Sequence, residues 1–246
     1  MLWRFYWPRM RVHIGIVALV SLLCYMMSLA GMLESDNLGQ GLYTVSSFVT
    51  SVCLYSAPLL FALYHDKLFT AQIPVSAGTR TGVMALYTYI VIPVAATLPW
   101  FAAMGVASLF TDKANVSELF INIAMADESL RDFNLPPMSI LAIQQLQVLL
   151  PLSVCLYVVA CSRRRPMLNG IVSIICSLVG LGILGAVFGI LIAYLEVTSS
   201  GFDAATFMQR FSSRLVMMAT AVATLCTVAG IIMTWALHRK LSYRQL

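Results

Sequence analysis

The sequence contains very little charge. Only 10% of its 246 residues are Asp, Glu, Lys or Arg, whereas 60% are hydrophobic and the mean hydropathy is +0.88. A soluble domain keeps about a quarter of its residues charged, so this chain cannot cover its surface in water. No stretch is polar and long enough to form a separate soluble domain. The composition therefore predicts an all-α integral membrane protein with a single transmembrane domain over 1–246, in contact with the lipid bilayer.

The sequence also lacks the common signatures of enzymes. It has no GxxxxGK[ST] phosphate-binding loop, no GxSxG turn and no HExxH helix. No carboxylate pair and no His–Asp pair falls inside an apolar block, where chemistry in the membrane would need it. We therefore expect no catalytic residue, no cofactor and no metal site, so any work on a substrate would draw energy from a partner. The net charge of +5 is attributed to connectors that set membrane topology, not to a nucleic-acid partner.

Six apolar blocks are long enough to cross a membrane, which takes about 20 helical residues. We expect helices near 13–32, 43–64, 83–108, 138–161, 168–195 and 214–237. None of these blocks carries a charged residue well inside. Because each block is continuously apolar and does not alternate, it favours a helix over a barrel strand.

The basic residues lie almost entirely in every second connector, and all but one of the acidic residues lie in the others. The basic set comprises Arg4, Arg9, Arg11, Lys67, Arg80, Arg163, Arg164, Arg165, Arg239, Lys240 and Arg244. The positive-inside rule then predicts that both termini are cytoplasmic. The long connector 109–137 is placed on the outer side.

The first apolar block has two further interpretations at its ends. Its basic leader and the small pair Ser28 and Ala30 also match a cleavable signal peptide, but its removal would spoil the charge alternation. Aromatic residues alternate with arginines in the segment 2–11, which predicts a short interfacial segment at the headgroup level. His13, like His65 and His238, falls at the end of a span, and we expect all three to occupy interface positions.

The fifth block is rich in glycine. Gly182, Gly185 and Gly189 are candidates for a helix-packing or subunit interface, since Gly185 and Gly189 form a small-xxx-small pair that lets two helices approach closely. The partner helix could belong to the same chain or to a second subunit. Prolines interrupt other blocks at Pro58, Pro93, Pro99 and Pro151, where each removes a backbone hydrogen bond and favours a kink.

The second cytoplasmic connector, 65–82, contains a recognisable stretch. Pro74, Val75 and Ser76, preceded by Leu68 to Ile73 and followed by Arg80, resemble the "leucine-proline-(valine or alanine)-serine, then a basic residue" motif of ABC-2 type transporter permeases. The six-span layout with a basic, aromatic start is also similar to the short bacterial members of that family, including those of the Bacteroidetes group. Family members often carry a charged residue directly after the serine, whereas here Ala77 and Gly78 come first.

The resemblance implies the membrane-spanning permease subunit of an ATP-driven transporter, and of the two directions of transport it favours export. The connector 65–82 would hold a short coupling helix seated on a separate ATP-binding cassette subunit, and the ATPase-coupling residues implied are Asp66, Lys67, Pro74, Val75, Ser76 and Arg80. A second permease copy or a homologous permease would complete the pathway. Two alternatives stay open: a non-transporting scaffold or assembly subunit of a membrane complex, and an intramembrane enzyme, for which no catalytic set is found.

Overall fold

The computed structural model describes residues 2–34, 36–63, 76–110, 137–162, 164–200 and 204–243. In these ranges the secondary structure is entirely helical apart from short turns. The helices are α1 (Leu2–Glu34), α2 (Asp36–Ala62), α4 (Ala77–Leu86), the π-helix η1 (Tyr87–Val91), α5 (Ile92–Phe110), α8 (Pro137–Cys161), α9 (Pro166–Ser200) and α10 (Ala204–Tyr243). The all-α prediction is therefore confirmed for the described part of the chain.

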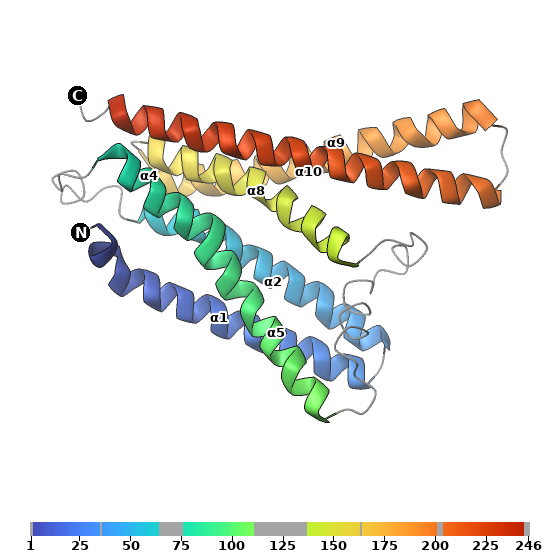
Figure 1. The fold of residues 1–246 in the computed structure, drawn as a ribbon, viewed down its shortest axis with the longest axis horizontal. Coiled ribbons are helices and arrows are strands. Elements are labelled where there is room, and N and C mark those ends of the chain that lie inside the picture. The colour runs from blue at the N-terminus through green and yellow to red at the C-terminus, as the bar shows by residue number, and fades with distance from the viewer. Residues whose placement is uncertain are drawn as a thin grey trace.

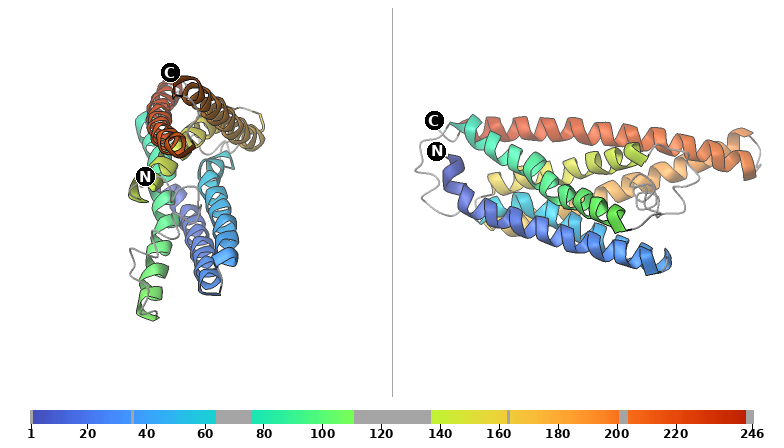
Figure 2. Two further views of the ribbon diagram at one scale, coloured as in Figure 1. Left: turned by 90° about the vertical axis from the view of Figure 1, so that its right-hand side faces the viewer. Right: turned by 60° about the horizontal axis from the view of Figure 1, so that its bottom comes forward.

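The helices run back and forth along one long axis, and both marked chain ends lie at the same end of the bundle (Figure 1). We call this the terminal end. The turn between α8 and α9 also lies there, whereas α9 and α10 project beyond the other helices at the opposite end (Figures 1 and 2). The most extensive helix contacts join α1 to α2 and α8 to α10.

Four helical stretches are long and apolar enough to cross a membrane: Tyr6–Ser28, Ala77–Ala103, Pro166–Leu195 and Met217–Ser242. The apolar parts of α2 and α8 whose side chains are described, Phe48–Ala62 and Val148–Cys161, are shorter than the roughly 20 residues that a span needs. The prediction of an integral membrane protein is confirmed at this coarser level. The number of spans is taken up below as a proposal.

Helix α1 extends much further toward the N-terminus than the predicted range 13–32. It begins at Leu2 and includes Pro8, near which it changes direction (Figure 2). Tyr6 packs edge-on against Phe61 of α2 with ring centroids 5.9 Å apart, and Met10 is fully buried. The segment 2–11 is therefore continuous with α1 and partly packed into the bundle, and its position at the headgroup level stays a prediction. Burial of Tyr6 and Met10 stabilises this first part of the helix, by about 1.5–3 kcal/mol for a large apolar side chain such as Met10.

The third long helix is continuous from Ala77 to Phe110 but contains one π-turn. The N–H of Ile92 donates to the carbonyl of Tyr87, five residues earlier, instead of to Thr88. Pro93 follows at once, and its ring has no N–H and would clash with the carbonyl four residues before it. The π-turn absorbs this conflict, so the proline produces a local widening of the helix where the sequence suggested a simple kink.

The core lies where α1, α2, η1 and α8 meet, near the terminal end. Gly170, in the first turns of α9, shows how tightly α9 enters this region. A Cβ atom placed on Gly170 would lie 2.7 Å from Leu59 Cδ2 and 2.8 Å from Val159 Cγ2, so only glycine fits between α2 and α8. On the other side of the bundle, Gly230 of α10 approaches Ser153 Oγ of α8.

The part of the α1–α2 contact away from the terminal end is built from small hydroxyl residues. Ser28 and Ser46 are buried, their Oγ atoms are 2.7 Å apart, and both hydroxyls lie within hydrogen-bond distance of the Cys24 carbonyl. Small polar residues let helix backbones approach closely and bond across the contact in lipid. This seam therefore ties α1 and α2 into one hairpin.

Candidate functional site

Within the connector 65–82, which carries the Pro74-Val75-Ser76 motif, the structure describes Ser76 and the residues that follow it. These residues form the start of α4. Ser76 is its N-cap: the Ser76 hydroxyl accepts a hydrogen bond from the N–H of Thr79 at 3.3 Å and lies 2.8 Å from the Thr79 hydroxyl. The N–H of Arg80 donates to the Ser76 carbonyl. A serine in this position satisfies one of the free N–H groups of the first turn, and this explains why the helix begins at Ala77.

Residues 77–82 of the predicted connector 65–82 are helical and continue directly into the third long helix, whose membrane span was predicted near 83–108. Of the residues implied in ATPase coupling, Ser76 is exposed at the helix start and Arg80 is half-buried one turn later. Asp66, Lys67, Pro74 and Val75 lie outside the described residues, as does His65.

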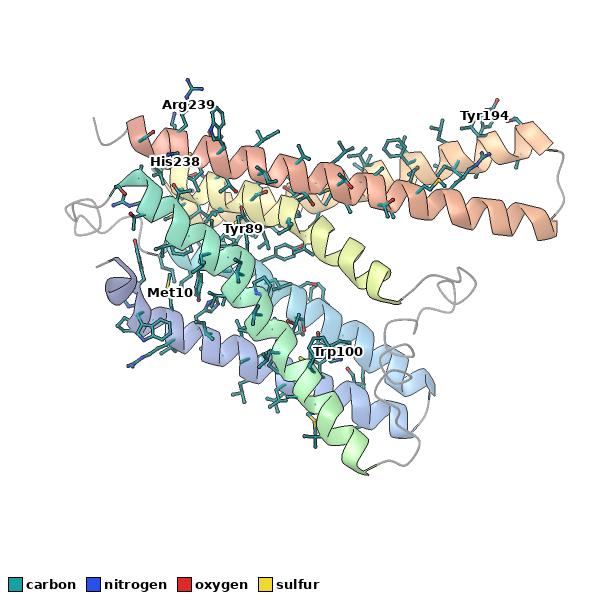
Figure 3. The ribbon with its side chains drawn as sticks, in the orientation of Figure 1. Met10, Tyr89, Trp100, Tyr194, His238 and Arg239 are labelled. Atoms are coloured by element: carbon teal, nitrogen blue, oxygen red, sulfur yellow. The ribbon has the colours of Figure 1, made fainter. Side chains whose placement is uncertain are left out.

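The first turn of α4 packs against the last turns of α10. A Cβ placed on Gly78 would lie 3.6 Å from Cε1 of His238, and α4 also contacts α1. His238 and Arg239 lie at the terminal end (Figure 3). The guanidinium of Arg239 lies 5.6 Å from the centre of the Trp235 ring, an arrangement typical of residues at a membrane–water interface. The start of α4 therefore lies beside His238, in the same last turns of α10 that carry Trp235 and Arg239.

A second polar feature lies inside the bundle and was missed by the sequence analysis. The two ring nitrogens of His13 each contact a hydroxyl from another helix: Nδ1 lies 2.5 Å from Tyr87 Oη and Nε2 lies 2.7 Å from Ser56 Oγ. The expectation that His13 lies at the membrane interface stays a prediction, and the structure adds that α2 and the π-turn pack over α1 at this level. The one signal in the sequence was Pro93, which indicates an irregular turn close to Tyr87.

The glycine face of α9 has no partner within the described chain. A Cβ placed on Gly182, Gly185 or Gly189 would meet no described atom within 4 Å. The described residues therefore show no close intramolecular contact at Gly185 and Gly189, and the interpretation as a subunit contact stays a prediction. The close intramolecular approach of α9 occurs at Gly170 instead.

The six cysteines carry free thiols; Cys155 and Cys226 are buried and Cys176 is exposed on α9. Among the residues that the structure describes, no group of three or more His, Cys, Asp or Glu side chains is arranged to hold a metal ion. The candidate functional features are therefore the N-terminus of α4, the contacts between helices, and the hydrogen-bonded junction of His13, Tyr87 and Ser56.

The described part of the chain consists of helices, and four helical stretches are long and apolar enough to cross a membrane. These features define a helical integral membrane protein. Comparisons with protein-family models, curated proteins and solved structures found no match to this chain.

Proposed function

We propose that the chain is the membrane-spanning subunit of an ATP-driven transporter, an ABC-2 type permease that exports its substrate and works with a separate ATP-binding subunit. The observation that carries the proposal is the Pro74-Val75-Ser76 stretch, whose serine caps α4 at the terminal end. A coupling element must lie at a membrane surface and connect directly to a span. The exposed Ser76 and the continuous helix from Ala77 to Phe110 meet both requirements.

The proposal includes six spans with both termini in the cytoplasm of a bacterial inner membrane. Support comes from the return of both chain ends to one end of the bundle, together with the exposed basic residues found there (Figure 1). These are Arg9, Arg11, Arg164, Arg165, Arg239 and Lys240. An excess of Lys and Arg marks the cytoplasmic side of a membrane protein.

A test of coupling is to purify the chain from its native membrane with its partners and measure ATP hydrolysis. We expect an ATP-binding subunit to co-purify and Ser76→Ala to reduce coupled hydrolysis about fivefold, which corresponds to the loss of about 1 kcal/mol on removing an N-cap. Ser76→Asn keeps a capping oxygen and should restore the activity.

Ser162→Ala is the matched control, because Ser162 lies in the turn after α8 and also accepts a side-chain hydrogen bond, from Asn169 Nδ2 at 3.1 Å. It should leave hydrolysis unchanged. Recovery of no ATPase, or hydrolysis that is insensitive to both Ser76→Ala and Pro74→Ala, contradicts the proposal.

A non-transporting scaffold subunit is the second candidate. The exposed apolar and glycine-bearing surface of α9 favours it, because a helix that few other helices cover can bind another membrane subunit. A scaffold would co-purify with a membrane complex that contains no ATPase, so the same purification distinguishes the two functions.

A further inference from the structure

We propose that His13, Tyr87 and Ser56 form a proton-responsive latch that fastens the π-turn of the third helix to α1 and α2. The three residues come from three different helices, and their polar atoms lie 2.5 and 2.7 Å from the imidazole nitrogens. Tyr87 is 0% exposed, and the junction lies close to Met10, which is near the terminal end (Figure 3). The proposal holds whether or not the chain works with an ATPase.

The hydrogen bonds assign one tautomer to His13. We assign the single hydrogen of the Ser56 hydroxyl to the Cys53 carbonyl, which lies 2.5 Å away, so toward His13 the Ser56 oxygen accepts. Nε2 must therefore carry a hydrogen and donate it to Ser56. In the neutral ring Nδ1 then has a free lone pair, which accepts from the Tyr87 hydroxyl.

Protonation of His13 reverses the polarity of one contact. Nδ1 would gain a hydrogen that points at the Tyr87 hydroxyl hydrogen, so the tyrosine must redirect its O–H or the contact must open. The Tyr87 ring cannot simply swing away, because it packs edge-on against Phe61 with centroids 5.7 Å apart, and Phe61 in turn packs on Tyr6. Because these rings pack on one another, reversal or opening of this hydrogen bond acts on the packing of all three helices.

Among the residues that the structure describes, no acidic side chain faces His13. The groups that contact its ring nitrogens are the hydroxyls of Ser56 from α2 and Tyr87 from the π-turn. The charged residues nearest in sequence are Arg11 and Arg9, two and four residues before His13 on α1, and Arg80, seven residues before Tyr87. On the other helices that contact α4 or the π-turn, Tyr89 pairs with Thr234 of α10 and His238 approaches Gly78. The packed ranges 2–33, 37–63, 76–110, 137–161 and 204–243 contain no Asp or Glu.

The π-turn makes this junction a suitable place for a switch. Its wider turn already departs from the regular helix, so a small change in the hydrogen bond of Tyr87 can alter how α4 and α5 are joined. The neighbouring Tyr89 faces the other half of the bundle, where its hydroxyl lies 3.1 Å from Thr234 Oγ1 (Figure 3). Tyr87 and Tyr89 thus attach the same π-turn to opposite sides of the bundle. Of these two contacts, the one made by Tyr87 involves the titratable side chain of His13.

The test combines imidazole nitrogen NMR with thermal unfolding of the purified full-length chain in detergent. The chain has three histidines, so His13→Gln identifies the His13 signals. At pH 8 we expect His13 to carry its hydrogen on Nε2. On acidification Nδ1 takes up a proton, and the apparent unfolding midpoint falls over the same pH interval.

Tyr87→Phe removes only the hydroxyl and serves as the second variant. We expect it to lower the midpoint by about 2–4 °C at pH 8, the size of effect that loss of one hydrogen bond has in a chain of this length. This difference from the unsubstituted protein should change once Nδ1 is protonated, because the Tyr87 hydroxyl can then no longer donate to Nδ1. Tyr89→Phe is the matched control, and its effect should not change over that interval.

A hydrogen on Nδ1 at pH 8 overturns the proposal. So does a His13 that stays unprotonated throughout the pH range in which the protein is folded, or a Tyr87→Phe difference that is independent of the protonation of His13.

Discussion

Single residues determine where the helices of this protein touch, and Gly170 is the clearest example. Its missing side chain lets α9 pass between Leu59 of α2 and Val159 of α8 at distances that leave no room for a methyl group. Val159 is fully buried and β-branched, so it cannot rotate aside freely. The approach of α9 to the core therefore depends on this one position.

We expect Gly170→Ala to destabilise the protein. Overpacking costs about 1–3 kcal/mol, which exceeds the gain of at most about 1 kcal/mol from the better helix propensity of alanine. The apparent unfolding midpoint in detergent measures the difference. Gly180→Ala is the control, since a Cβ at Gly180 meets no described atom within 4 Å. A Gly170→Ala variant that is as stable as the control would show that α9 does not pack as closely as described.

At the scale of elements, α9 differs from the other helices in how little of it is covered. In the apolar window of Pro166–Leu195, 11% of residues are buried, compared with 17% for Tyr6–Ser28 and Met217–Ser242 and 33% for Ala77–Ala103. Helical geometry places Gly182, Gly185 and Gly189 on one face, with Gly180 turned well away from it. A face of this kind suits close contact with a second helix in lipid, in agreement with the proposed second copy of the permease.

We expect Gly185→Leu and Gly189→Leu to weaken self-association of the purified chain about tenfold each, in line with the 1–2 kcal/mol typical of contacts between membrane helices. Light scattering coupled to size-exclusion chromatography in detergent measures the oligomeric state. Gly180→Leu adds the same bulk away from this face and should have no effect. A protein that is monomeric before substitution, or equally sensitive at all three positions, would exclude α9 as the contact.

The positions of the helices could be predicted from the sequence because they depend on local features. Long apolar runs indicate each helix, and residues such as Ser76 mark a start through a hydrogen bond to a residue only three positions away. The extension of α1 to Leu2 could not be predicted in this way. It depends on Tyr6 and Met10 finding a buried place against other helices.

The internal junction was missed for the same reason. His13 and Tyr87 are 74 positions apart, and His13 and Ser56 are 43 apart, so their contacts exist only through the packing of whole helices. The glycines show this as well. Gly170 and Gly185 look alike in the sequence, but only the neighbours in space decide that Gly170 is enclosed and Gly185 is open.

At the scale of the whole molecule, the central claim is an even number of membrane crossings. The helices return the chain to the end from which it started (Figure 1). Six exposed basic residues belong to the helix ends and the turn at that end, namely Arg9, Arg11, Arg164, Arg165, Arg239 and Lys240, whereas Arg214 is exposed further along α10. In the proposed orientation the charge of those six residues would keep that end on the cytoplasmic side, because moving Lys and Arg across the bilayer is unfavourable. The transporter proposal depends on this arrangement, since an ATPase could otherwise not reach the start of α4.

The most direct test is labelling of single-cysteine variants with a membrane-impermeant maleimide in intact cells, after replacement of the native cysteines. Leu2→Cys and Ser242→Cys should react only after permeabilisation, whereas Ser129→Cys, in the connector 109–137, should react in intact cells. Labelling of position 2 and position 242 from opposite sides of the membrane would contradict the account.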